Sequence, residues 1–152
     1  MRNDRNRCRS LGQLTMLQTL RVAQGELALA DATATRAEAE EAEREAERLL
    51  DAARQDYRRM LSSGSFAAEG FRLAGAMVNL LEQEAGTGRE RTAQAREAEA
   101  ARELRWQRQR HRQDQLGALH KAARRKLARK EEEKAMAEAG QLLLHRGGRS
   151  RA

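Results

Sequence analysis

Small apolar residues recur along the first third of the chain at the spacing of a helix face. They alternate steps of three and four residues from Leu20 to Ala37 and, after a shift of register, again from Ala39 to Ala53. This alternation predicts a long helix with a coiled-coil seam. Most members are alanine, and burying a methyl-sized side chain contributes around 1 kcal/mol at best, so the seam should be marginally stable in its middle. The members are Leu20, Ala23, Leu27, Ala30, Ala34 and Ala37, then Ala39, Ala42, Ala46, Leu49 and Ala53.

The interruptions of the helical pattern are few. The chain contains no proline, the residue that costs about 3 kcal/mol inside a helix. Ser62 to Ser65 is a turn-compatible run, and Gly64 within it can adopt a positive φ, so the chain should reverse there. Two glycines in Gly86-Thr87-Gly88 cost about 2 kcal/mol relative to alanine and predict a kink or a helix restart.

These signals predict an all-α fold, a long antiparallel α-helical coiled-coil hairpin. The first helix is predicted to begin at Ser10, after a disordered basic leader at residues 1–9. Residues 10–146 then form a single hairpin domain, with arms at 10–61 and 89–146 and a tip at 62–88. A disordered tail is predicted for residues 147–152.

The most apolar window of the chain follows the predicted turn, at residues 66–85. Two interpretations stand side by side. The window can pack on Tyr57, Met60 and Leu61 across the turn, or part of it can stay exposed as a docking surface, because one helix cannot bury several faces at once. Its large apolar residues are Phe66, Phe71, Leu73, Met77, Val78, Leu80 and Leu81.

Composition and charge fit a thin, elongated core. Charged residues make up 35% of the chain and aromatic residues 3%, with a mean hydropathy of −0.90, which favours coiled coils over compact domains. Intrinsic disorder is the rival interpretation, but the helical leucine spacing and high alanine content favour helix. Net charge is +3 over residues 1–30, −5 over 31–100 and +9 over 101–152. Antiparallel folding would therefore create a strongly basic terminal end and a mildly acidic turn end.

No catalytic or cofactor signature emerges from the sequence. It contains no phosphate-binding glycine loop, nucleophile elbow or zinc-protease motif. His111, His120 and His145 lack the i, i+4 spacing that a metal prefers on a helix. The single cysteine, Cys8, cannot form an internal disulfide, and no apolar run reaches membrane-spanning length. We therefore expect a cytoplasmic, non-enzymatic protein without cofactor or metal.

Residues 102–130 are rich in arginine and lysine, which raises the question of nucleic-acid binding. Positive charge alone supplies salt-sensitive affinity for phosphates. Strand stacking calls for interleaved aromatic residues, and apart from the histidines Trp106 is the only aromatic residue in this stretch. A solvated basic helix face is the simpler interpretation, and no specific nucleic acid is expected as a partner.

The last arm resembles the FliJ family, the stalk component of the flagellar export apparatus, and the equivalent YscO-type proteins of virulence type III secretion. The resemblance lies in the segment Glu103 to Arg110 (ELRWQRQR), followed by Leu116, Leu119, a basic stretch and the run Glu131 to Glu133. The early leucines, the long Ala/Glu/Arg run and the chain length are also similar. The sequence does not separate the flagellar from the virulence assignment.

The resemblance implies a fold, partners and site residues. Members of the family form an antiparallel hairpin similar to the coiled coil of the F-type ATPase γ subunit. Their terminal end enters a hexameric export ATPase, and the opposite region contacts the cytoplasmic domain of the export gate, so the protein would be peripherally associated with the inner-membrane export apparatus. Export chaperones are further partners of the family. By this resemblance the ATPase-facing residues are Arg105, Arg108, Arg124 and Arg125, and the gate-facing element spans Phe71 to Leu81.

One position departs from the family pattern. That pattern places apolar residues at steps of four and three, followed by a histidine four residues further on. Leu73, Met77 and Leu80 keep the apolar spacing, and Phe71 lies just before them, but Glu84 stands where the histidine would be. Two other classes remain open, a generic coiled-coil structural or adaptor protein and a non-specific nucleic-acid-binding helical protein.

Overall fold

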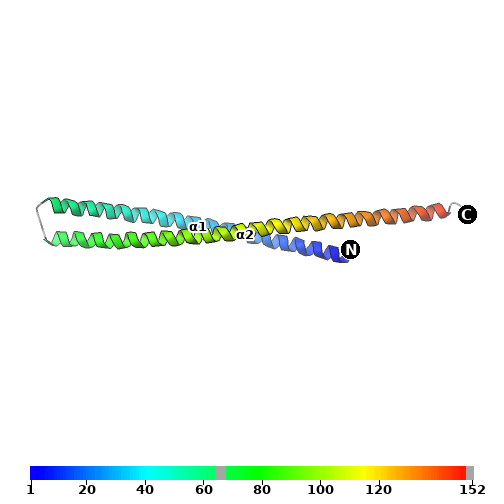
Figure 1. Ribbon diagram of the computed structural model, residues 1–152, viewed down its shortest axis with the longest axis horizontal. Helices are drawn as coiled ribbons and strands as arrows, with labels where there is room; N and C mark the ends of the chain where they lie inside the picture. The colour runs from blue at the N-terminus through cyan, green and yellow to red at the C-terminus, as the bar shows by residue number, and fades with distance from the viewer. Residues whose placement is uncertain (64–67, 150–152) are drawn as a thin grey trace. The chain divides into compact units, whose positions relative to one another are not determined.

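The protein consists of two long helices packed against each other in opposite directions (Figure 1). The computed structural model describes the backbone of residues 1–63 and 68–149, and side chains as far as residue 141. Helix α1 spans Arg2–Ser62 and helix α2 spans Ala68–Arg149. The predicted all-α antiparallel helical hairpin is therefore confirmed.

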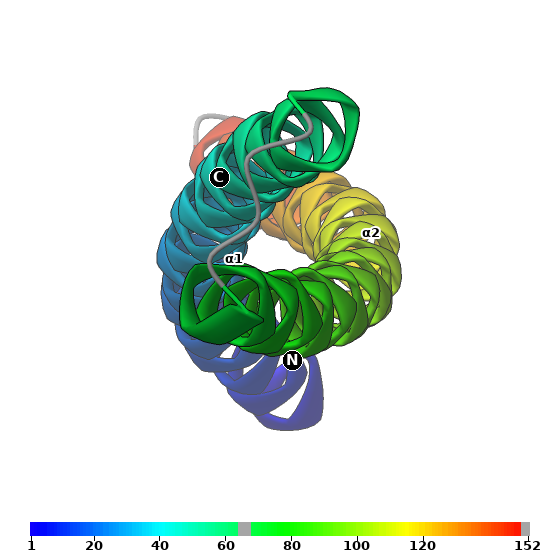
Figure 2. The ribbon, with the colours of Figure 1, turned by 90° about the vertical axis from the view of Figure 1, so that its left-hand side faces the viewer.

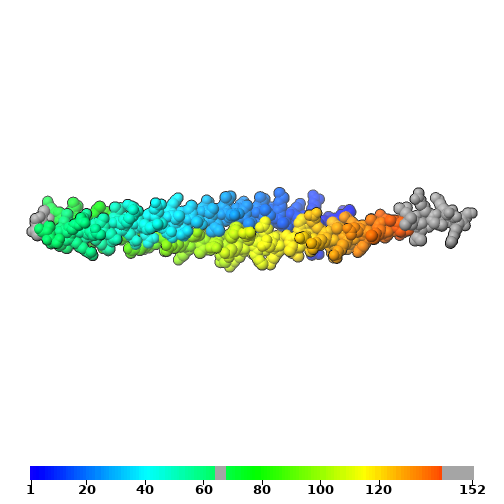
Figure 3. All heavy atoms as spheres, turned by 90° about the horizontal axis from the view of Figure 1, so that it is seen from above, coloured from blue at the N-terminus to red at the C-terminus, as the bar shows by residue number. Residues whose placement is uncertain are grey.

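Contacts between the helices divide the chain into two units. Unit 1 combines Met1–Gln24 with Gln107–Ala152, and unit 2 is Gly25–Trp106. In unit 1 the beginning of α1 lies along the later part of α2 (blue beside yellow and orange, Figure 3). In unit 2 the end of α1 lies beside the start of α2 (Figure 2). Unit 1 carries a net charge of +12 and unit 2 a net charge of −5.

The buried face of α1 follows a heptad pattern from Asp4 to Tyr57. Residues at alternating steps of four and three are buried or half-buried over this whole length, with no shift of register. We call this set the α1 seam. Only about half of it is apolar. Its members are Asp4, Cys8, Leu11, Thr15, Gln18, Val22, Gly25, Leu29, Ala32, Arg36, Ala39, Glu43, Ala46, Leu50, Ala53 and Tyr57.

The seam predicted from the sequence is wrong in its first set and partly correct in its second, where Ala39, Ala46 and Ala53 belong to the α1 seam. All six residues of its first set, from Leu20 to Ala37, are exposed, and in the second set Ala42 and Leu49 are exposed. Alanine is the best helix former and gains little from burial, so its spacing reports helix propensity more than packing. The true seam passes through polar residues such as Gln18 and Arg36, which a search for apolar periodicity leaves out.

The apolar core of unit 2 lies toward the turn. Leu50 of α1 and Leu81 and Ala85 of α2 are buried together. Two turns beyond Leu50, Tyr57 stacks on Phe71 with ring centroids 4.8 Å apart. Three half-buried residues surround this cluster: Ala46, Ala53 and Val78.

Unit 1 is held together largely by polar contacts. The buried Gln18 side chain donates a hydrogen bond to the backbone carbonyl of Gln109, at 2.9 Å. Near the start of α1, Lys130 pairs with Asp4 and Arg5 pairs with Glu131, each at 2.8 Å. Helix α1 begins at Arg2, so residues 2–9 are helical, and the predicted disordered leader and helix start at Ser10 are corrected.

Helix α1 ends where the turn was predicted. The carbonyl of Arg59 accepts hydrogen bonds from the Ser62 hydroxyl at 2.9 Å and from the Ser63 amide at 3.0 Å, which satisfies one of the last carbonyls of the helix. Residues 64–67, including Phe66, lie outside the described residues. At the other end α2 continues to Arg149, so residues 147–149 of the predicted tail are helical, while 150–152 are not described.

Helix α2 runs without interruption through Gly86-Thr87-Gly88, so the predicted restart is absent. A Cβ added at Gly86 would meet nothing within 4 Å, and one at Gly88 would lie 3.5 Å from the Cα of Glu43 in ordinary contact. Neither glycine has the positive φ that only glycine adopts readily. The two glycines weaken the helix without breaking it.

Replacing Gly86 with alanine is expected to stabilise the protein by about 1 kcal/mol, because alanine is the better helix former and the added methyl group has open space. Urea unfolding followed by circular dichroism measures the change. A loss of stability would instead indicate a local break in α2 that requires glycine.

Thr92 is the largest fully buried side chain in the described part of the chain, at 1% exposure. Its hydroxyl oxygen has no hydrogen-bond partner there. An unsatisfied buried polar group costs about 1–3 kcal/mol. Thr92→Val keeps the shape of the side chain and is expected to raise the midpoint of urea unfolding. Thr87→Val is the control, because it removes an exposed hydroxyl that donates a hydrogen bond to the Glu84 carbonyl. A lower midpoint for Thr92→Val would show that the hydroxyl is satisfied.

Candidate functional site

An exposed apolar stripe lies on α2 within unit 2. Leu73, Met77 and Leu80 are 74%, 51% and 52% exposed, although they belong to the most apolar window of the chain. Their steps of four and three place them along one helix face. We call these three residues the α2 stripe. The face of α2 that packs on α1 runs instead through Val78, Leu81 and Ala85.

The structure separates the four predicted gate residues into two groups. Phe71 stacks on Tyr57 and is half-buried, so it contributes to the packing of the hairpin. The α2 stripe lies outside that packing. The packing interpretation is confirmed for Tyr57, whereas Met60 and Leu61 are exposed. The α2 stripe is also exposed, and its use as a docking surface stays a prediction.

The predicted ATPase-facing arginines are all exposed. Arg108, Arg124 and Arg125 belong to unit 1, and Arg105 belongs to unit 2. Since unit 1 carries a net charge of +12, it should attract acidic partners over a distance of about one Debye length, roughly 8 Å at physiological salt.

Two shallow hollows gather basic side chains within unit 1. Lys121, Arg124 and Arg125 line one of about 380 Å³. Arg124 also lines the second, of about 490 Å³, together with Arg5 and Arg9 from α1. Guanidinium groups in such an arrangement bind carboxylates or phosphates. Sequence reasoning missed the contribution of Arg5 and Arg9, because it assigned both to a disordered leader.

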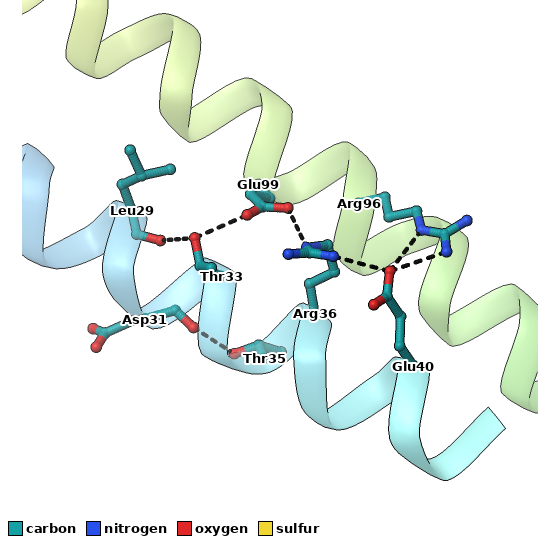
Figure 4. Close-up of polar contacts among 8 residues, drawn as sticks. All are labelled: Leu29, Asp31, Thr33, Thr35, Arg36, Glu40, Arg96 and Glu99. Atoms are coloured by element: carbon teal, nitrogen blue, oxygen red, sulfur yellow. Dashed lines mark hydrogen bonds and ion pairs between the residues drawn. The ribbon is translucent and has the colours of Figure 1, made fainter. Parts of the chain in front are cut away.

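A charged network crosses between the helices of unit 2 (Figure 4). The Arg36 guanidinium of α1 lies 2.6 Å from Glu99 of α2 and 3.0 Å from Glu40. Arg96 of α2 also donates to Glu40, at 3.0 and 3.1 Å, and the Thr33 hydroxyl donates to Glu99 at 2.8 Å. Arg36 occupies a position of the α1 seam that an apolar residue would fill in an ordinary coiled coil, and such polar layers can specify the register of two helices.

The hydrogen bonds from Arg96 and then Arg36 hold the pKa of Glu40 below its ordinary value of 4.5. A carboxyl group whose pKa is lower in the folded protein than in the unfolded protein stabilises the fold at pH values above its unfolded-state pKa. This contribution is lost as the pH falls through its folded-state pKa. Acid is therefore expected to weaken unit 2 through this carboxylate.

We expect Glu40→Gln to reduce the drop in melting temperature between about pH 5 and pH 3, because glutamine has no proton to take up. Glu41→Gln, one residue along on an exposed position, is the matched control and should keep the wild-type acid profile. Thermal unfolding followed by circular dichroism measures both. Identical acid profiles for Glu40→Gln and wild type would remove Glu40 as a source of the pH dependence.

Comparison with protein-family models, with curated proteins and with solved structures finds no match to this chain. No helix among the described residues has both the length and the apolar character needed to cross a membrane. The functional assignment therefore rests on the surfaces described above.

Proposed function

We propose that this protein is a non-enzymatic stalk and coupling component of a flagellar or virulence type III protein export apparatus. The observation that carries the proposal is the α2 stripe. Three large apolar residues at steps of four and three stay exposed on a hairpin with little apolar core, and they occupy the positions that the FliJ resemblance assigns to gate contact.

The two units suit different partners. The basic surface of unit 1, with Arg108, Arg124 and Arg125, would bind the hexameric export ATPase. The α2 stripe of unit 2 would contact the cytoplasmic domain of the export gate. Export chaperones are further expected partners, and the protein would act at the inner membrane through the gate without entering the bilayer.

The test is the hydrolysis rate of the cognate export ATPase with and without this protein, measured together with hexamer formation at moderate salt. Stimulation with ring formation supports the stalk role. If the helical protein neither associates with the ATPase nor changes its rate, the stalk proposal fails and a generic coiled-coil adaptor is favoured.

The charge of unit 1 also favours a second candidate, non-specific binding to nucleic acid. The half-buried Trp106 is a poor stacking platform, so such binding would depend on phosphate contacts and fall steeply between about 50 and 200 mM salt. Retained ATPase binding over the same salt range would separate the two functions.

A further inference from the structure

A second apolar stripe lies on the outer face of α1, away from the α1 seam. It runs from Met16 to Ala37 along one continuous helix, at alternating steps of four and three, over about 32 Å. We call it the α1 outer stripe. All of its members are exposed: Met16, Leu20, Ala23, Leu27, Ala30, Ala34 and Ala37. Because alanine spacing alone reports helix propensity, the observation rests on the three large members, Met16, Leu20 and Leu27, which are 69%, 54% and 69% exposed on one helix face.

The sizes of the side chains along this stripe suit an antiparallel copy of the same stripe. Leu27 lies at the middle, the large residues Met16 and Leu20 and one alanine, Ala23, lie before it, and only alanines lie after it. Two antiparallel copies centred on Leu27 place Leu20 of each opposite Ala34 of the other, and Met16 opposite Ala37. Large residues then fill the space above alanines, as close packing requires. Ala23 of each copy faces Ala30 of the other, so one alanine pair remains on each side of Leu27, whereas a parallel arrangement would set all four alanines against their own copies.

The charges along α1 favour the same direction. Residues 1–24 carry a net charge of +4, and residues 30–52, which would lie opposite them in the antiparallel pair, carry a net charge of −5. Parallel pairing would bring like charges together along the whole helix. The copies of Glu26 near the symmetry axis are the main pair of like charges and offset part of the attraction.

We propose that two copies of this chain associate as an antiparallel dimer through the α1 outer stripe. The contact is isologous, so each copy presents the same surface and the assembly closes at two chains. The proposal does not depend on the proposed export function, because it rests only on side-chain size, exposure and charge along α1.

Disulfide trapping tests the direction of pairing. In a Cys8→Ser background, Leu27→Cys should form a covalent dimer on oxidation, because the two copies of residue 27 meet at the symmetry axis. Ala34→Cys alone should not, because its two copies lie about 20 Å apart, well beyond disulfide reach. Crosslinking of both variants would show parallel pairing and overturn the proposal.

Sedimentation equilibrium tests the surface itself. Leu20→Ala is expected to raise the dimer dissociation constant at least about ten-fold, because both copies lose a leucine contact. The control is Leu119→Ala in the same unit, since Leu119 is 53% exposed against 54% for Leu20, and it should change the constant by less than about two-fold. A monomer at the highest soluble concentration, or equal effects of the two variants, would overturn the proposal.

Discussion

Replacing Leu50 with alanine is expected to lower the free energy of unfolding by about 3 kcal/mol, the largest effect of any single substitution considered for this fold. Leu50 is 3% exposed and packs with Leu81 and Ala85 in the apolar core of unit 2. The change removes buried methyl groups and leaves a cavity beside Leu81 and Ala85. Urea unfolding at neutral pH, followed by circular dichroism, measures the difference.

The neighbouring leucine supplies the control. Leu49 is 49% exposed, and Leu49→Ala should cost less than about 1 kcal/mol. The two variants remove the same atoms one residue apart on the same helix. An equal loss of unfolding free energy in the two variants would contradict the α1 seam. A larger loss for Leu49→Ala would support the seam predicted from apolar spacing instead.

The same pair of leucines shows why the buried face was not predictable from the sequence. Leu49 continues an apparent row of alanines, whereas Leu50 belongs to a row that includes Arg36 and Glu43. Arg36 is tolerated there because Glu40 and Glu99 pair with it. Glu40 is a local partner four residues along α1, but Glu99 belongs to α2, about sixty positions away in the chain, so a local pattern reveals only part of this compensation.

Features that depend on local chemistry were predictable. The absence of proline and the abundance of alanine predict helix, and the serines from Ser62 predict the end of α1. The helical state of residues 2–9 was not predicted, because the local sequence does not show that this segment lies along α2, where Asp4 and Arg5 pair with Lys130 and Glu131. The basic hollows of unit 1 were missed for the same reason.

The α2 stripe leads to the second large expected effect, on binding. The triple variant Leu73→Ala, Met77→Ala and Leu80→Ala is expected to weaken binding to the cytoplasmic domain of the export gate at least about ten-fold, because burying each large apolar side chain at an interface contributes about 1.5–3 kcal/mol. Its unfolding free energy should change by less than about 1 kcal/mol, since all three side chains lie outside the apolar core. Calorimetric titration and urea unfolding measure the two quantities separately.

The chain offers a control of identical composition. Leu104, Leu119 and Met136 are also exposed and also lie on α2, so replacing them with alanine removes the same two leucines and one methionine from other places. If both triple variants weaken binding equally, general surface hydrophobicity explains the interaction and the α2 stripe is not the gate site. If the stripe variant loses its helicity, the three residues contribute to the core. Gate contact through this face is supported only if the stripe variant alone loses binding and keeps its stability. The reason is that exposed side chains are available to a partner but are not needed for the fold.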